Sequence, residues 1–321
     1  NHIFYRKLYF DHANLVIIGE ELAREGIFEA LEILERNPDF RTTALIALSR
    51  GAKAKDVLSI INPVDQINSN KILKTIEHSE SYSGDAINMN VGELINLLFL
   101  EGQGAILTGI SLEGNKNEGR MEENVTPSKQ KTFISINEIG IFRGDKLVGW
   151  MDEKNAKGTL WVLGKIKSAP VTIPWKEVKD GAAINILRSK AKIKAKIEKF
   201  QPKIKVQIKA EGTLSEVHAP IDLTKPKIIE KLEKDLTETI KEEILGSISF
   251  AKEHNADIFG FGNSIRQHNK KYWDSIKEKW FESYFPNLEV DVEVEAFIRR
   301  SDIKLKPFFF YQKKYGEENS E

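Results

Sequence analysis

Two long stretches in which apolar residues alternate with lysines constrain the fold of this chain more than any other feature. In Ile184 to Ile197 and in Lys203 to Ala210, residues such as Ile193 and Ile204 alternate with lysines on the opposite side. A period of two predicts strands with one face on a core and the other in solvent. Glu289 to Ile298 alternates in the same way, with acidic residues outward. The three segments therefore predict a sheet with one charged, solvated face.

A long helix is predicted between the second and third of these strands, from about Thr224 to His254. Its apolar residues recur every three or four positions: Ile228, Ile229, Leu232, Leu236, Ile240, Ile244 and Ile248. That spacing gives one apolar stripe, and Lys225-Pro226 stands where the first turn of a helix tolerates proline. A second helical segment, Asn269 to Tyr284, follows. We expect an antiparallel sheet that both helices cover on one face, which is an α+β arrangement.

The charged faces of these strands have two interpretations. If the lysine-bearing and acid-bearing strands are neighbours, their side chains form solvated cross-strand ion pairs that contribute little to stability. If the strands lie far apart, each patch stays uncompensated and can serve as an electrostatic docking face. We favour the first interpretation.

The N-terminal part of the chain has the pattern of a βαβ unit. Leu15 to Ile18 is a continuous apolar run, as expected of a strand buried on both faces, and Ala44 to Leu48 is a second one. Residues from Leu22 to Leu34 have helical spacing, so the two strands are expected to be parallel. This unit is small for a domain, and we expect the opening part of a longer N-terminal domain to be missing here.

The middle of the chain predicts a β-hairpin. Phe133 to Phe142 and Lys146 to Met151 flank Arg143-Gly144-Asp145, a short connection that contains glycine. The apolar residues change sides along the first strand, which indicates a bulge near Asn137. A further strand is expected at Thr159 to Ile166.

These segments predict a multidomain α+β fold. We expect a truncated N-terminal α/β domain with a linker at residues 1–84, which contains the βαβ unit, and a small mixed α+β domain at residues 85–168. A C-terminal α+β domain at residues 169–312 is expected to hold an antiparallel sheet packed by long helices, followed by a polar tail at residues 313–321. A chain of 321 residues agrees with such a division, because one hydrophobic core seldom serves so many.

Composition excludes several classes of function. Lys plus Arg and Asp plus Glu number 48 each, so no net field attracts nucleic acid or anionic lipid, although local charged patches can still exist, and we expect no nucleic-acid partner. Cysteine is absent, which removes disulfides, thiolate catalysis and cysteine metal sites. No apolar run approaches the roughly 18 residues that a bilayer span requires. The longest runs, Leu15 to Ile18 and Leu97 to Leu100, have the size of core segments.

No motif indicates catalysis, a cofactor or a metal. Gly260-Phe261-Gly262 lacks the third glycine of a dinucleotide fingerprint and follows a predicted helix instead of a strand. Gly109 to Glu113 misses the nucleophile elbow, which needs a glycine two residues after the serine. The six histidines form no HExxH motif. With 48 acidic residues, chance carboxylate pairs give no support to a glycosidase-like site. We therefore assign no catalytic, cofactor-binding or metal-binding residue.

Aromatic residues are the candidates for an interaction surface. Tryptophans normally pack in cores, and a smaller number anchor interfaces. Four consecutive aromatic residues, Phe308 to Tyr311, cannot all face inward on one strand, so another domain or a partner is expected to cover some of them. The residues that we name as a possible interaction surface are Trp150, Trp161, Phe259, Phe261, Phe308 and Phe309.

Four segments, taken in order, resemble a known family. They are Asn37-Pro38-Asp39-Phe40-Arg41-Thr42-Thr43, Lys53-Ala54-Lys55-Asp56-Val57-Leu58, Gly140-Ile141-Phe142-Arg143-Gly144-Asp145-Lys146-Leu147-Val148-Gly149-Trp150 and Asp257-Ile258-Phe259-Gly260-Phe261-Gly262. Their order and spacing resemble the Ger(x)C spore germination family, the lipoprotein C subunit of germinant receptors in spore-forming bacteria. The resemblance runs from Tyr9 to about Pro307. The family's signal peptide and lipid-carrying cysteine are missing here, so we expect no residue of this chain to carry the lipid.

The resemblance implies a three-domain lipoprotein on the outer face of the spore's inner membrane. It implies two integral membrane subunits, A and B, as partners in sensing small germinants, and it carries over no catalytic residue. The leading hypothesis is a non-catalytic subunit of this receptor complex, needed for nutrient-triggered spore germination. A direct germinant-binding module, with the Trp-bearing middle domain as the pocket, is the alternative. A cell-wall hydrolase is a weaker one.

Overall fold

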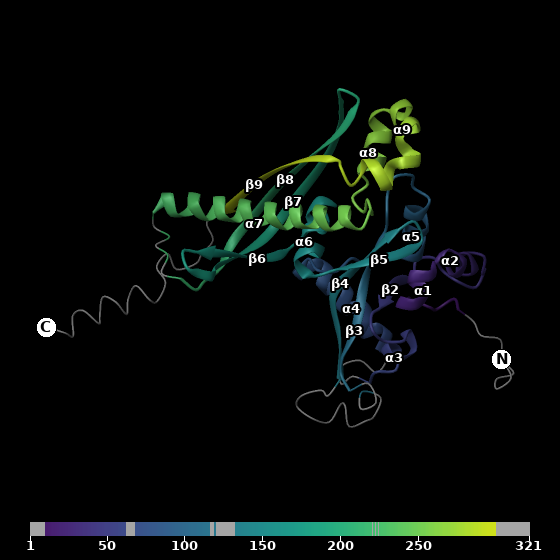
Figure 1. The fold of residues 1–321 in the computed structure, drawn as a ribbon. Coiled ribbons are helices and arrows are strands. Elements are labelled where there is room, and N and C mark those ends of the chain that lie inside the picture. The colour runs from purple at the N-terminus through teal and green to yellow at the C-terminus, as the bar shows by residue number, and fades with distance from the viewer. Residues whose placement is uncertain are drawn as a thin grey trace.

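The computed structural model describes residues 10–61, 68–115, 119, 132–219, 221, 223 and 225–299. These residues form a five-stranded sheet in the order β1-β2-β3-β4-β5 and a four-stranded sheet in the order β6-β7-β8-β9. Helices flank both sheets (Figure 1). The arrangement confirms the predicted α+β class.

The first sheet begins with the predicted parallel pair. Its strands are β1 Leu15–Gly19, β2 Leu45–Ser49, β3 Ile106–Gly114, β4 Thr132–Arg143 and β5 Lys146–Met151. β1, β2 and β3 are parallel, and β4 and β5 continue the sheet in antiparallel fashion. All five residues of β2 are buried, as predicted. In β1 only Ile18 is buried, because this strand lies at the edge of the sheet, so the expectation that β1 is buried on both faces is wrong.

The helices of this part are short. They are α1 Glu20–Glu25, α2 Phe28–Glu35, α3 Ala54–Leu58, α4 Asn68–His78 with a π-helical turn at Ser79–Ser83, and α5 Val91–Leu98. The single helix expected between β1 and β2 is broken at Gly26, whose φ of 141° is outside the range of other residues. A Cβ there would also lie 2.6 Å from a carboxylate oxygen of Asp145.

The β4–β5 hairpin confirms its prediction, including the bulge. Gly109 pairs with Glu138 and Ser111 pairs with Ser135, so two residues of β4 stand opposite one residue of β3 in the region of Asn137. The strand expected at Thr159 to Ile166 is wrong. That region belongs to α6 Glu153–Val162, which begins where the Asp152 carboxylate accepts the Asn155 backbone N–H at 2.9 Å.

The second sheet holds the alternating segments. Its strands are β6 Ala169–Trp175, β7 Val178–Glu198, β8 Gln201–Val217 and β9 Glu289–Arg299. β6, β7 and β8 are antiparallel, as expected, but β9 runs parallel to β8. The reason is the long helix α7 Pro226–Glu253, which returns the chain along the sheet before β9 begins, so that β9 enters at the same end as β8.

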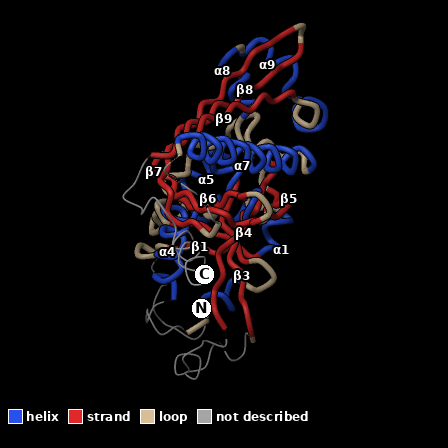
Figure 2. The backbone as a smooth tube through the Cα atoms, turned by 90° about the vertical axis from the view of Figure 1, so that its left-hand side faces the viewer, coloured by secondary structure: helices blue, strands red, loops and turns tan. Residues whose placement is uncertain are grey.

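The second helical segment is broken and does not lie along the sheet as α7 does. It contains α8 Phe261–His268, α9 Lys270–Ile276, a 3₁₀ turn at Lys277–Lys279 and a π-helical turn at Trp280–Tyr284. In both ribbon views, α8 and α9 lie beside the far end of the β7–β8 hairpin (Figures 1 and 2). The hydroxyl of Tyr272 donates to the carbonyl oxygen of Phe200 in the hairpin turn at 3.0 Å.

The charged face of the second sheet confirms the interpretation that we favoured. Lys203, Lys205 and Lys209 of β8 stand in register with Glu289, Asp291 and Glu295 of β9. Lys203 approaches Glu289 to 3.0 Å and Lys209 approaches Glu295 to 2.7 Å. These are exposed pairs, which orient the strands' side chains but add little stability.

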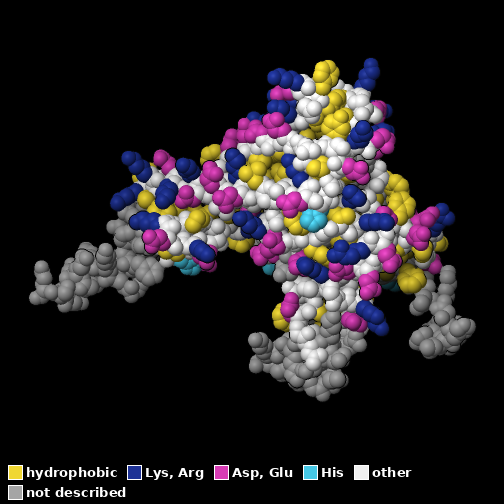
Figure 3. All heavy atoms as spheres, viewed as in Figure 1, with side chains coloured by type: hydrophobic (Ala, Val, Ile, Leu, Met, Phe, Trp, Pro, Cys, Tyr) yellow, Lys and Arg dark blue, Asp and Glu magenta, His cyan; other side chains and the backbone are white. Residues whose placement is uncertain are grey.

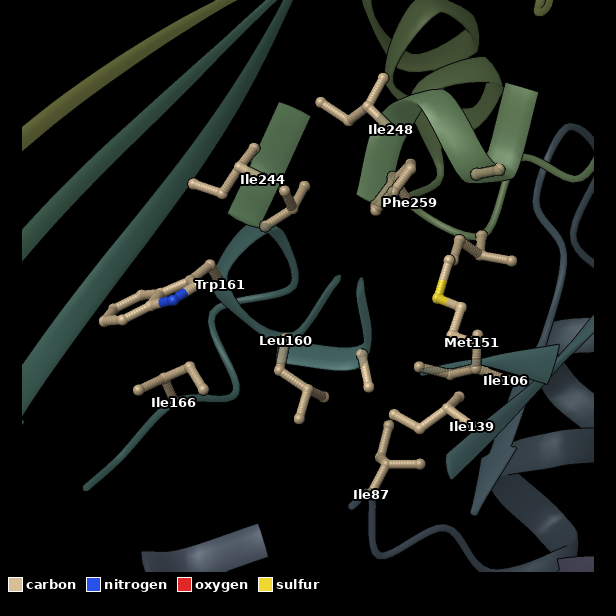
Figure 4. Close-up of a cluster of buried hydrophobic side chains, with 14 of the residues drawn as sticks. Ile87, Ile106, Ile139, Met151, Leu160, Trp161, Ile166, Ile244, Ile248 and Phe259 are labelled. Carbon is tan, nitrogen blue, oxygen red and sulfur yellow. The ribbon is translucent and has the colours of Figure 1, made fainter. Parts of the chain in front are cut away.

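The two sheets share one hydrophobic core, and α6 lies between them. Figure 4 shows Trp161 and Leu160 of α6 between Ile244 of α7 and the strand residue Ile139. Gly158 lets α6 approach α7 closely, since a Cβ there would lie 2.8 Å from the Cβ of Ser247. Strands on both sides of the boundary predicted at residues 84 and 85 pair in the first sheet. How the chain divides into independently folding domains remains a prediction.

Candidate functional site

The C-terminal end of α5 forms an apolar ridge on the surface. The helix begins with a capping box, in which the Asn90 side chain accepts the Glu93 N–H at 2.8 Å and Glu93 accepts the Asn90 N–H at 3.2 Å. Val91, Leu94 and Ile95 face the core. One face of a helix cannot bury four successive residues, so Leu97, Leu98 and Leu100 stay half-buried and Phe99 is 66% exposed. We call residues Leu97 to Leu100 the α5 ridge.

A groove of about 190 Å³ separates the α5 ridge from α2. Phe28 of α2 meets Phe99 edge to face, with 5.4 Å between the ring centroids. Leu31, Ile95 and Leu98 form the floor, and charged residues of α2 form the rim. Figure 3 shows hydrophobic side chains gathered at this right-hand side of the molecule.

A second groove, of about 350 Å³, lies on the other side of the α5 ridge. Leu97 and Leu100 form one wall, and the other comes from β3, the end of α6 and the segment after α7, through Ile106, Leu163 and Ile258. An apolar ridge between two apolar grooves with a polar rim is the usual anatomy of a protein interface. It offers shape and hydrophobic contact, with charged side chains such as Glu32 and Lys165 around the apolar surface.

A polar hollow of about 720 Å³ lies where β1 and β2 end. Glu20 is one of the residues that line it. The Glu20 carboxylate accepts from Trp150 Nε1 at 3.0 Å, from Arg24 at 2.7 Å and from the Gly51 N–H at 3.3 Å. Burial opposes ionisation of Glu20, but these hydrogen bonds outweigh it and lower the pKa of the carboxyl. The guanidinium of Arg50 lies 5.2 Å from the centre of the Trp150 ring.

The structure separates the residues that we named as a possible surface. Trp161, Phe259 and Phe261 are 0%, 3% and 0% exposed, so they belong to the core and cannot meet a partner; this part of the prediction is wrong. Trp161 is anchored inside by its Nε1, which donates to Glu243 at 2.8 Å. Trp150 is half-buried beside the polar hollow. Phe308 and Phe309 lie outside the described residues and stay predictions.

Sequence reasoning missed the α5 ridge, although its signal was present. Leu97 to Leu100 has the size of a core segment, and its length alone does not show which residues are exposed. Four successive apolar residues at a helix end exceed the buried face of a helix, so some must be exposed. Phe28 gave no signal, since its exposure depends on where α2 lies against α5.

Neither a metal site nor a membrane-spanning helix is found in the described part of the chain. No group of three or more His, Asp or Glu side chains is placed there to hold a metal ion. None of the helices in the described ranges has the length and hydropathy that crossing a bilayer requires.

Comparison with known proteins gives consistent matches along the chain. Residues 1–112 match the family model of the spore germination protein N-terminal domain, and residues 137–302 match that of the spore germination B3/GerAC-like C-terminal region. The chain is 29% identical to spore germination protein KC of Bacillus subtilis (strain 168) over 94% of this chain and 75% of that protein. It is 24% identical to spore germination protein B3 of the same organism, over 86% and 70%.

A solved structure shares the fold. The crystal structure of the GerBC protein aligns with a TM-score of 0.68 at 20% identity, and covers 91% of this chain and 81% of that one. At this identity the match supports the multidomain α+β fold alone.

Proposed function

Because the chain belongs to the spore germination B3/GerAC-like family, the Ger(x)C family, we propose that it is a non-catalytic subunit of a germinant receptor complex. Relatives that cover most of this chain are spore germination proteins, so the chain has a role in spore germination. The proposal adds that it works as the lipoprotein subunit beside integral membrane subunits A and B. The complex would lie at the spore inner membrane, with this subunit held on the outer face by a lipid anchor.

The α5 ridge is the observation that supports assembly. Phe28, Leu98 and Phe99 present apolar surface on two helices that the core does not cover. Water-exposed aromatic side chains beside a preformed groove are typical anchors of protein interfaces. A stable partner needs to bury about 800 Å² on this side, and the two grooves beside the ridge extend the surface beyond the aromatic pair. The expected occupant is an apolar segment of a partner subunit.

The test is a double variant, Phe28→Asp with Phe99→Asp, introduced into the full-length protein in spores. Two charges placed in an apolar contact are expected to abolish recovery of the membrane subunits with this protein, and with it the nutrient response. Both residues are exposed, so the urea midpoint of the purified chain should change little.

The matched control is Ile33→Asp, because Ile33 of α2 is 71% exposed and does not line the groove. The control is expected to retain the receptor. Recovery of an intact receptor with the double variant would contradict docking at the ridge. Recovery of a working receptor from spores without this protein would contradict the proposed function itself.

Direct binding of a small germinant is the second candidate, and the polar hollow favours it. Ligands of α/β folds bind beyond the carboxyl ends of parallel strands, and the hollow lies there, lined by the Glu20 carboxylate, the Arg24 side chain and the turn at Gly51. Calorimetry of the purified chain with amino acids, sugars and nucleosides tests it, with Glu20→Gln as the variant that should abolish any heat. No measurable heat with any of these compounds would count against this candidate.

A further inference from the structure

The turn of the β7–β8 hairpin holds an exposed aromatic residue in an unfavourable backbone conformation. Glu198 pairs with Gln201, so Lys199 and Phe200 form a two-residue turn. Their φ values are 49° and 63°, the left-handed region in which hairpin turns prefer Asn-Gly. Phe200 is 87% exposed, more than any other large hydrophobic side chain in the described ranges. Neither local propensity nor burial explains a phenylalanine here.

The turn is held in place by α9. The Tyr272 hydroxyl donates to the carbonyl oxygen of Phe200 at 3.0 Å, and the hydrogen bond brings the exposed Lys270 and Lys271 of the first turn of α9 to the same end of the molecule. Figures 1 and 2 show the hairpin extending past the rest of the second sheet and ending beside α8 and α9. Phe200 therefore lies at the projecting end of a hairpin that a hydrogen bond connects to α9.

Positive charge exceeds negative charge at the same end. Lys203 pairs with both Glu289 of β9 at 3.0 Å and Glu198 at 3.3 Å, so these two acidic residues share one lysine. Lys196, Lys199, Lys270 and Lys271 are exposed and form no ion pair with a described residue. In Figure 3 hydrophobic atoms at this tip have Lys or Arg side chains on both sides.

We propose that this hairpin apex, made of Lys196, Lys199, Phe200, Lys270 and Lys271, binds the surface of an anionic lipid bilayer. The lysines attract acidic headgroups, and the Phe200 ring enters the boundary between headgroups and acyl chains. A lipid surface fits better than a protein, because a protein partner needs about 800 Å² of complementary surface on each side. A single projecting ring inside a group of lysines offers little such area. The proposal does not depend on the α5 ridge or on the receptor.

Vesicle sedimentation with the full chain tests the apex. The protein should bind vesicles of phosphatidylcholine mixed with phosphatidylglycerol and should not bind vesicles that contain only phosphatidylcholine. About 1 M NaCl should abolish the binding. Phe200→Ala should weaken the apparent affinity about tenfold. Lys199→Ala, Lys270→Ala and Lys271→Ala should each weaken it about fivefold.

The control is Phe297→Ala. Phe297 is 51% exposed and lies on β9 opposite Glu211, near the other end of that strand pair, so its loss should leave vesicle affinity unchanged. Three results would overturn the proposal: unaltered binding by Phe200→Ala, equal binding to neutral vesicles, or binding to polyglutamate with no binding to anionic vesicles. The last result would indicate an acidic protein partner instead. All three would leave the receptor proposal standing, since that proposal is tested in spores through Phe28 and Phe99.

Discussion

Asp257 should make the stability of this protein fall as pH rises from weakly acidic to neutral. Its side chain is fully buried. The carboxylate accepts the Phe261 N–H at 3.1 Å, the Gly262 N–H at 2.7 Å and Trp280 Nε1 at 3.1 Å. Its own carbonyl oxygen accepts the N–H of Gly104, in the segment before β3, at 2.7 Å. Burial outweighs these donors and raises the pKa of Asp257 to about 7.

The sign of the effect follows from proton binding. An aspartate in the unfolded chain has a pKa of about 3.9, so between about pH 4 and pH 7 the unfolded state has lost a proton that the folded state keeps. The unfolding free energy then falls by about 1.4 kcal/mol per pH unit. From pH 5 to pH 7 the loss is on the order of 2 to 3 kcal/mol, and above pH 7 it levels off because both states are ionised.

The assay is urea unfolding followed by tryptophan fluorescence at pH 5, 6, 7 and 8, with Asp257→Asn as the variant that cannot titrate. The other carboxyls are common to both proteins, so the difference in unfolding free energy isolates Asp257. This difference should shift by on the order of 2 to 3 kcal/mol between pH 5 and pH 8 in favour of the variant. Trp280→Phe removes one donor that stabilises the ionised carboxylate, so the pKa of Asp257 should rise further. The unfolding free energy should then keep falling to a higher pH. A difference that stays constant from pH 5 to pH 8 would refute the reasoning, since Asp257 would then be ionised in the folded protein throughout.

Three further substitutions test the packing between the sheets and the charged strands. Gly158→Val should destabilise the chain by about 3 kcal/mol or more in urea, because its side chain would overlap Ser247 on α7; an unchanged midpoint would mean that the helices separate freely. Trp161→Phe removes the indole N–H that donates to the buried Glu243 carboxylate at 2.8 Å, and should lower the unfolding free energy by about 2 kcal/mol at pH 7. An effect within experimental scatter would show that water replaces the lost donor. Lys205→Ala should leave the urea midpoint unchanged, since this lysine and its acidic partners on β9 are solvated; a clear loss would show that the exposed pairs act as a network.

The second sheet was the most predictable part of the fold, and its one error has a clear cause. Residues such as Ile193, Ile204 and Val292 alternate with charged residues, and this pattern located β7, β8 and β9 and the side that each turns to solvent. The pattern is the same whichever way a strand runs, so it could not show that β9 is parallel to β8. Only the length of α7, which is long enough to return the chain along the sheet, contains that information.

The candidate site was less predictable, because exposure depends on neighbours distant in sequence. Phe259 and Phe261 are stacked on each other at 5.0 Å and buried, whereas Phe99 is exposed. All three are aromatic residues next to helix ends. What separates them is tertiary contact. The segment of Asp257 packs on Trp280 and on the residues just before β3, while Phe99 stays 66% exposed beside its edge contact with Phe28.

Net charge was also a poor guide to local electrostatics. Equal numbers of acidic and basic residues predicted no long-range field, and that argument holds for the chain as a whole. The register of the strands then decides which charges are paired. The acidic residues of β9 pair with lysines of β8, whereas outward lysines of β7 and α9, among them Lys196 and Lys270, have no ion pair among the described residues. A neutral composition can therefore hold a basic apex.

The contacts of α6 and of the segment around Asp257 connect the two sheets, and they decide how the α5 ridge and the hairpin apex act together. α6 packs against both sheets and α7, and Asp257 ties the segment before α8 to Trp280 and to Gly104. A core that is continuous across these contacts holds the ridge and the apex at a fixed separation. Binding at one of them then sets the orientation of the other, so two weak contacts reinforce each other only on partners with matching geometry. A flexible linker would instead let each surface bind alone.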